Sequence, residues 1–409
     1  MFWDQQRGFE AIVANDDLFS EVSPFWYHAE ADGTIVPYRT AAGASYEDPA
    51  ILAFLRSRGI LVIPTVTNIV DGVWDGALVE QIISDAGRRA LNIASIVELA
   101  VANGYDGIDL DYEDLLASYR DAYTAFVNEL AAALHAQGKL LTVNVYAKTE
   151  EPGTWDGPQS QDWSAIGQVA DEVRIMIYEY HWATSGPGPI APIDWVNDVL
   201  AFARSTIPSY KVMHGVPLYG YDWVGQSGID LVWQQAMALA SQRGATVNWD
   251  TASASSWFEY VSAGKQHTVW FENAASTDAK LQAMTDSDIG GVTLWRLGGE
   301  DPGTWPVLRE HLGLGSPLPD VVPPTVTIVS PLNGSWLQKK QKIEAHASDD
   351  TAVARVEFYI NNTLFASDQT APYLVYWNTR RAATTTVIKA VAYDTSGNAT
   401  AAQVTTFVR

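Results

Sequence analysis

The chain has 409 residues, and its 48 acidic and 25 basic residues give a formal net charge of −23 at pH 7. This charge opposes phosphate backbones and anionic membrane surfaces, so we expect no nucleic-acid partner and no membrane insertion. The absence of cysteine excludes disulfides, thiolate metal sites and a cysteine nucleophile. Acidic residues are spread through the first twenty positions, unlike a signal peptide, so we expect any export signal to have been removed.

Short apolar segments alternate with amphipathic segments from about residue 19 to residue 300. The segments that we expect to form strands are residues 21–29, 59–68, 104–113, 139–148, 172–182, 211–223 and 290–299. This alternation predicts parallel strands joined by helices. With Phe2, Trp3 and Asp4 taken as the tail of a truncated eighth strand, the prediction is an α/β fold, a (β/α)₈ TIM barrel over residues 1–315.

Two further segments depart from the barrel pattern. Residues 224–288 are too long for a single connection and contain a strand-like run at 267–273, so we expect a small α+β insertion there. Residues 316–324 form a proline-rich linker. Residues 325–409 contain short alternating runs separated by turn residues, which predicts an all-β immunoglobulin-like sandwich.

An acidic stretch lies within the third expected strand. Residues 104–114 read GYDGIDLDYED and carry four closely spaced carboxylates, Asp106, Asp109, Asp111 and Glu113. On an extended strand Asp109, Asp111 and Glu113 project from one face, and the apolar residues between them project from the other. Carboxylates held together away from water raise the pKa of at least one of them. The pattern therefore indicates a chemical role rather than a stabilising one.

A buried acidic ladder that binds Ca²⁺ is the structural alternative. Calcium loops of the DxDxDG type need a tight turn with glycine, whereas this stretch has strand periodicity. The seven histidines show no spacing typical of a metal site, and residues 185–190, SGPGPI, read as a loop rather than a phosphate-binding turn. We therefore expect no metal and no cofactor.

Several motifs resemble glycoside hydrolase family 18, the chitinase and N-acetylglucosaminidase family. DGIDLDYE at 106–113 is similar to the DGxDxDxE signature of that family, and IMIYE at 175–179 resembles its Met-x-Tyr-Asp strand with Glu179 in place of Asp. GVPLYGYDW at 215–223 and LWRLGGED at 294–301 look like the branch of bacterial spore-cortex and spore-germination glycosidases. The C-terminal region is similar to bacterial immunoglobulin-like modules of secreted enzymes.

The resemblance implies a role for each matching residue. Glu113 would be the general acid that protonates the glycosidic oxygen, and a raised pKa suits that role. Asp111 would turn toward the acetamido group of the substrate, and Asp109 would share a proton with it. Tyr178 would donate its hydroxyl to the acetamido carbonyl oxygen, and Trp295 would form the floor under the sugar at the cleavage point.

Further residues at strand ends are candidate substrate contacts: Glu179, Tyr219, Tyr221, Trp223, Asn144 and Tyr146. For each aromatic residue, a place in the core is the alternative interpretation. We expect Asp106 to be structural. For Glu300, we expect a salt bridge with Arg296 rather than a substrate contact.

The resemblance also implies an activity. The substrate would be an N-acetylated polysaccharide, peptidoglycan or chitin, cleaved with retention at β-1,4 bonds next to N-acetylglucosamine by its own 2-acetamido group. The motifs at 215–223 and 294–301 favour peptidoglycan or spore cortex over chitin. Two other classes stay open, a non-catalytic sugar-binding barrel and an adhesion protein that acts through residues 322–409. We expect a monomer that is secreted or associated with the cell envelope.

Overall fold

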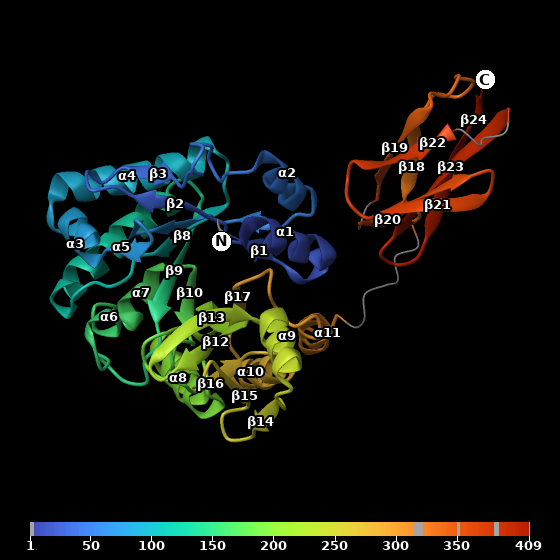
Figure 1. The fold of residues 1–409 in the computed structure, drawn as a ribbon. Coiled ribbons are helices and arrows are strands. Elements are labelled where there is room, and N and C mark those ends of the chain that lie inside the picture. Colours follow the sequence, from blue (N-terminus) through green and yellow to red (C-terminus); the bar gives the residue numbers. More distant parts are fainter. Residues whose placement is uncertain (1–3, 315–321, 350–351, 380–383, 409) are drawn as a thin grey trace. The chain divides into compact units, whose positions relative to one another are not determined.

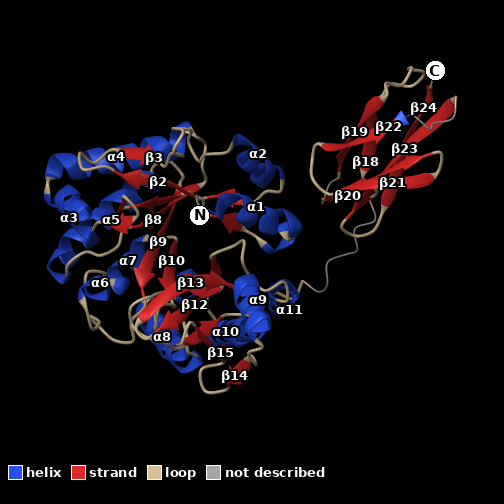
Figure 2. Cartoon of the chain, in the orientation of Figure 1, coloured by secondary structure: helices blue, strands red, loops and turns tan. Residues whose placement is uncertain are grey.

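The computed structural model describes residues 4–314, 322–349, 352–379 and 384–408. The chain divides into two compact units, residues 1–315 and 316–409. Figure 2 shows helices and strands together in the first unit and almost only strands in the second. Each unit has its own hydrophobic core, so each is described by itself.

An eight-stranded sheet forms the centre of the first unit (Figure 1). Its strand order is β17 (Gly291–Trp295), β11 (Val212–Pro217), β10 (Glu172–Met176), β9 (Leu140–Tyr146), β8 (Gly107–Asp111), β5 (Thr65–Thr67), β2 (Phe25–Ala29) and β3 (Ile35–Pro37). Neighbouring strands are parallel except for β2 and β3. Each predicted strand segment contributes one parallel strand to this sheet, and the predicted TIM-barrel class is confirmed.

Helices connect these strands and surround the sheet (Figure 2). They are α1 (Gln5–Ala14), α2 (Pro49–Ser57), α3 (Gly76–Ser84), α4 (Ala86–Ala102), α5 (Arg120–His135), α6 (Asp156–Gln159), α7 (Trp163–Val169), α8 (Ile193–Thr206), α10 (Ala274–Ser287) and α11 (Thr304–His311). Several begin at an aspartate whose carboxylate accepts a backbone N–H of the first turn, as Asp75 does for α3 and Asp162 for α7. Within the described residues, none of the helices has the length and apolar character needed to cross a membrane.

Short strands and turns complete the first unit. β1 (Glu21–Val22) pairs with β4 (Leu61–Val62), and β6 (Ile69–Val70) pairs with β7 (Val73–Trp74). Single 3₁₀ turns occur at Asp16–Leu18, Ala117–Tyr119 and Ser209–Lys211.

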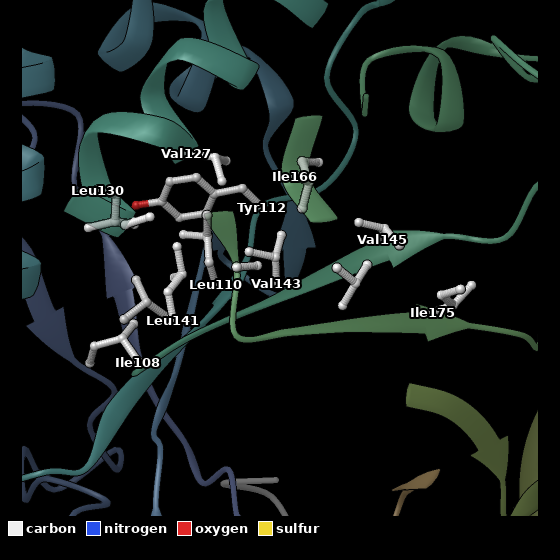
Figure 3. Close-up of a cluster of buried hydrophobic side chains, with 14 of the residues drawn as sticks. Ile108, Leu110, Tyr112, Val127, Leu130, Leu141, Val143, Val145, Ile166 and Ile175 are labelled. Carbon is white, nitrogen blue, oxygen red and sulfur yellow. The ribbon is translucent and has the colours of Figure 1, made fainter. Parts of the chain in front are cut away.

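The core between the sheet and the helices explains the alternation seen in β8. Ile108, Leu110 and Tyr112 are fully buried, and they point toward α5 together with side chains of β9 (Figure 3). The ring of Tyr112 stacks on Phe126 of α5 with centroids 5.9 Å apart. Burial of each such side chain contributes about 1.5–3 kcal/mol. The apolar face thus anchors the strand and leaves the acidic face for the barrel interior.

The predicted strand at 211–223 is two strands in the structure. β11 ends at Pro217, and β12 (Tyr219–Val224) joins a separate antiparallel sheet. A proline has no N–H to continue a ladder, which suits the end of β11. The separate sheet has the order β13 (Ser227–Val232), β12, β16 (Lys265–Phe271), β15 (Ser255–Ser262) and β14 (Asn248–Asp250), with α9 (Trp233–Arg243) packed on it.

The start of the chain also differs from the prediction. Asp4 does not end an eighth strand but directly precedes α1, and its carboxylate lies 2.5 Å from the guanidinium of Arg7, three residues along. That spacing brings two side chains together on a helix and not on a strand. Phe2 and Trp3 lie outside the described residues.

The second unit is a sandwich of two antiparallel sheets. One contains β18 (Thr325–Ser330), β19 (Lys340–Ser348) and β22 (Tyr373–Asn378), and the other contains β21 (Thr363–Asp368), β20 (Val353–Ile360), β23 (Thr385–Asp394) and β24 (Ala399–Phe407). Their inner faces bury Ile343, Phe358 and Ile388. In β23 buried and less buried positions alternate strictly, which is the pattern of a strand with one solvated face. This confirms the predicted sandwich.

Candidate active site

The acidic stretch follows β8 through the barrel interior. Gly107 opens the strand where a Cβ would lie 2.5 Å from the carbonyl oxygen of Leu140 on β9, so the glycine of the motif permits close pairing of the two strands. Asp106 accepts the backbone N–H of Val62 at 2.8 Å. This contact ties β8 to its neighbour on the other side and accords with a structural role.

Asp109 is enclosed by hydrogen-bond donors. Its carboxylate accepts the hydroxyls of Thr65 at 2.8 Å and Thr142 at 2.6 Å, and the amide of Asn144 at 2.9 Å. The guanidinium of Arg174 lies 3.1 Å away. These four donors hold the carboxylate of Asp109 in one orientation. The proton that Asp109 would share with Asp111 stays a prediction. Asn144, predicted to contact substrate, uses its amide on Asp109.

Asp111 lies further along the same face and is only 5% exposed. Burial, and then the neighbouring Glu113 and Asp109, raise its pKa well above the usual range, while the charge of Arg174 opposes the rise. Its Oδ1 atom is buried and has no hydrogen-bond partner among the described residues. A buried polar atom without a partner is costly, which suits a group that awaits a ligand.

Glu113 follows the last residue of β8 and is held through its backbone. The side-chain amide of Asn68, at the end of β5, donates to the carbonyl of Glu113 at 2.8 Å and accepts its N–H at 2.9 Å. The next residue, Asp114, has a positive φ of 62°. Gly76 of α3 packs against this turn so closely that a Cβ would lie 1.8 Å from the carbonyl oxygen of Asp114.

The side chain of Glu113 meets the hydroxyl of Tyr146, which donates to Oε2 at 2.6 Å. Burial raises the pKa of Glu113 to about 8; the Tyr146 hydrogen bond lowers it, and the charges of Asp114 and Glu179 raise it. Glu113 therefore keeps its proton at neutral pH and releases it as the pH rises through about 8. This is the behaviour that a general acid requires.

Tyr178 and Glu179, which follow β10, line the same cavity as Asp111 and Glu113. The ring of Tyr178 lies parallel to the indole of Trp295, with 6.5 Å between centroids and 9° between planes. Burial and the nearby carboxylates of Asp111 and Glu113 raise the pKa of Tyr178, so its hydroxyl stays a donor. Glu179 has a φ of 61° and accepts the hydroxyls of Tyr219 and, at 2.9 Å, Tyr221.

A cavity of about 990 Å³ joins these groups. The predicted site residues that line it are Asp109, Asp111, Glu113, Asn144, Tyr146, Tyr178, Glu179, Tyr219 and Trp295. Tyr221 and Trp223 are not among its described lining residues. Trp223 is 1% exposed and donates its ring N–H to the carbonyl of Trp182 at 3.1 Å. The side chain of Trp223 therefore belongs to a buried cluster with Ile190 and Tyr219, and that of Tyr221 supports Glu179.

The expected pairing of Glu300 is also different. Its carboxylate accepts the backbone N–H groups of Gly298 at 2.7 Å and Gly299 at 3.0 Å. Arg296 forms a salt bridge of 3.0 Å with Asp230 on the insertion. Glu300 thus shapes the loop that follows Trp295.

Sequence reasoning missed five residues of the site: Asn68, Trp74, Trp155, Arg174 and Trp182. Trp155 and Trp182 line the cavity with about half of each side chain exposed, 49% and 47%. Trp155 follows the predicted strand at 139–148 and Trp182 ends the one at 172–182, which was a usable signal for sugar-stacking surfaces. Arg174 was visible as the one charge within the apolar run VRIMI at 173–177.

Comparison with known proteins bears on the identity of this site. The model of glycosyl hydrolases family 18 matches residues 72–300, more than half of the chain and all of the acidic stretch. The chain belongs to glycosyl hydrolase family 18. It is therefore a glycoside hydrolase, from a family that acts on N-acetylated glycans. A bacterial Ig domain model matches residues 324–405, so the predicted family resemblance is confirmed for both units.

Relatives of this family 18 enzyme include sporulation proteins and chitinases. The putative sporulation-specific glycosylase YdhD of Bacillus subtilis (strain 168) is 32% identical over 298 residues, which cover 71% of this chain and 69% of the relative. The cortical fragment-lytic enzyme of Bacillus anthracis is 30% identical over 312 residues, 74% of this chain and 70% of the relative. The crystal structure of a chitinase from Chromobacterium violaceum ATCC 12472 superposes with a TM-score of 0.69 at 30% identity, over 74% of this chain and 95% of that one.

Proposed function

We propose that this enzyme hydrolyses β-1,4 bonds next to N-acetylglucosamine in peptidoglycan or spore cortex, with retention and with the substrate's own acetamido group as nucleophile. The observation that carries the proposal is the pairing of Glu113 with Asp111. One keeps a proton up to a pH of about 8, and the other presents a buried oxygen without a partner.

In the first step Glu113 gives its proton to the glycosidic oxygen as the bond from that oxygen to the anomeric carbon breaks. The acetamido carbonyl oxygen forms the new bond to the anomeric carbon, which yields an oxazolinium ion. Asp111 accepts the acetamido N–H and its negative charge balances the positive ion, while Tyr178 donates to the acetamido oxygen. Water then attacks the anomeric carbon, the bond from that carbon to the acetamido oxygen breaks and restores the neutral acetamido group, and Glu113 takes up the proton that the water loses.

The geometry favours a nucleophile that belongs to the substrate. A conventional retaining enzyme places two carboxylates on either side of the bond, about 5–5.5 Å apart. Here Asp111 and Glu113 come from one face of one strand and its end. Asp109 is occupied by four donors, and Glu179 by two tyrosine hydroxyls. The contacts of Asp109 and Glu179 therefore disfavour either one as the nucleophile.

The choice of polymer follows the relatives. YdhD and the cortical fragment-lytic enzymes support peptidoglycan or spore cortex. The structural match to a chitinase favours the second candidate, chitin oligomers. An intact acid in a formed cavity disfavours a non-catalytic sugar-binding barrel. We further propose a secreted or envelope-associated monomer in which residues 316–324 link the barrel to a sandwich that acts as a spacer.

Two substrates offered in parallel test the proposal. Purified peptidoglycan and chitin oligomers are incubated with the enzyme, and the products are identified by mass spectrometry. We expect muropeptide fragments ending in N-acetylglucosamine, and slower but measurable cleavage of chitin oligomers. De-acetylated chitosan oligomers are the matched control, because their linkages are the same and only the acetyl group is missing. Cleavage of chitosan at a comparable rate would refute the substrate-assisted mechanism.

A further inference from the structure

Arg174 is a buried charge that the proposed mechanism does not use. It lies on β10 and is 5% exposed. Its guanidinium donates to the hydroxyl of Ser23 at 2.6 Å, lies 3.1 Å from Asp109 and 3.3 Å from Glu172, and contacts Glu21. An arginine is always charged in proteins. One permanent positive charge is therefore held among three carboxylates inside the barrel.

These contacts join Arg174 to two groups of residues. Glu172 lies two residues before it on β10, and Glu21 belongs to β1. Asp109 belongs to the acidic stretch on β8. A guanidinium that served only to hold β1 against β10 would need Glu21 and Ser23 but not Asp109.

We propose that Arg174 is a positioning residue for the cleavage reaction, which holds the carboxylate of Asp109 in place and sets the electrostatic field that Asp111 meets. The inference rests on the proposed function, because it uses the roles given there to Asp111 and Glu113. Arg174 does not contact the substrate. It acts through its contact with Asp109 and through its own positive charge.

The charged and titratable groups that face this region come from several elements. They are Asp109, Asp111 and Glu113 from β8 and its end, Glu172 from β10, Tyr178 after β10, Glu21 from β1, Tyr38 after β3 and Tyr123 from α5. Burial raises the pKa of Glu172 to about 7, with Arg174 opposing and Glu21 adding to the rise. Below that pH the positive charge of Arg174 is therefore opposed mainly by Asp109 and Glu21.

The sign of the effect on Asp111 follows from these charges. Arg174 favours the ionised form of Asp111, against burial and the charges of Glu113 and Asp109. If the ionised form balances the oxazolinium ion, activity falls on the acidic side as Asp111 takes up its proton. Removal of Arg174 should move this acidic limb to higher pH. Neutralising Glu21 and Glu172, the other two carboxylates that contact Arg174, should move the acidic limb to lower pH.

The experiment compares the pH profiles of kcat/KM for three variants on a soluble N-acetylated chito-oligomer. For Arg174→Gln we expect the acidic limb to rise by about one pH unit, which is a tenfold loss at the pH of the wild-type limb. The double variant Glu21→Gln with Glu172→Gln should shift the limb downward. Both carboxylates are changed because Glu172 would ionise more readily once Glu21 is neutral. Arg174→Lys keeps the charge and should restore most of the wild-type profile.

Arg309→Gln is the matched control. Arg309 belongs to α11, is 4% exposed and pairs with Asp17 and Asn15. It is not among the described residues that line the cavity. It should lower the melting temperature without moving the acidic limb. A folded Arg174→Gln variant with a wild-type limb would overturn the inference. If that variant does not fold, an unchanged or upward limb in the double carboxylate variant overturns it. Glu113→Gln, assayed in parallel, reports on the proposed function alone, because it removes the acid and leaves Arg174 in place.

Discussion

The hydroxyl of Tyr146 offers a direct test of how the general acid is tuned. It donates to Glu113 at 2.6 Å and so favours the ionised carboxylate. A hydrogen bond to a charged group contributes about 1.5–3 kcal/mol, and one pKa unit corresponds to about 1.4 kcal/mol. Tyr146→Phe should therefore raise the pKa of Glu113 by about one to two units above its value of about 8. The basic limb of activity should move up by the same amount.

The same change should lower turnover at neutral pH. Glu113 becomes negative as it gives up its proton, and Tyr146 stabilises that charge in the transition state. Loss of about 1.4 kcal/mol of this stabilisation corresponds to a tenfold fall in kcat. Initial rates between about pH 5 and pH 10 on a chromogenic N-acetylated substrate would give both quantities.

Tyr112→Phe is the matched control for this prediction. The Tyr112 hydroxyl is also buried, but it donates to Asn92 at 3.2 Å on the outer face of β8. That variant should lose some stability and keep the wild-type pH profile. A basic limb that stays in place or falls in Tyr146→Phe, with Tyr112→Phe unchanged, would show that Tyr146 does not tune the acid.

Three further outcomes follow from the site. Glu113→Gln should lose about 10²- to 10⁴-fold in kcat. Its melting temperature, relative to the wild type, should be higher at pH 9 than at pH 5. The reason is that the raised pKa of Glu113 makes the wild type lose stability as the pH rises through about 8. Equal gains at both pH values would contradict the buried, protonated acid. Asp111→Asn should abolish most turnover and move the acidic limb, and an unchanged limb would show that the two carboxylates titrate independently. Removal of residues 316–409 should leave hydrolysis of short soluble oligomers nearly unchanged, because each unit has its own core; failure of the barrel to fold would show dependence on the sandwich.

The sequence predicted those parts of the fold that follow from local pattern. Alternation in β8 identifies which side chains face the helices and which face the interior, and this alone places Asp109 and Asp111 inside the barrel. The same reasoning failed at 211–223, where β11 of the barrel sheet ends at Pro217 and β12 of the separate sheet begins at Tyr219. Two consecutive strands with apolar and aromatic residues read as one when only their composition is visible.

The partners of the acids could not be predicted, because they depend on contacts between distant segments. Tyr146 reaches Glu113 across 33 positions, and Asn68 reaches its backbone across 45. The donors around Asp109 also come from distant segments. Strand register brings Thr65 and Thr142 beside it, and Arg174 reaches it from β10.

Gly76 has no functional group, yet the orientation of the Glu113 carboxyl group depends on it. A methyl group there would meet the carbonyl oxygen of Asp114 at 1.8 Å, and Asp114 is the residue that directly follows Glu113. Even alanine, the residue that helices prefer most, would push the turn and displace the carboxyl from the bond. A mutational scan scored by activity would thus mark the first residue of α3 as strictly as the acid itself. Engineers who stabilise this enzyme by replacing helical glycines should leave this one in place.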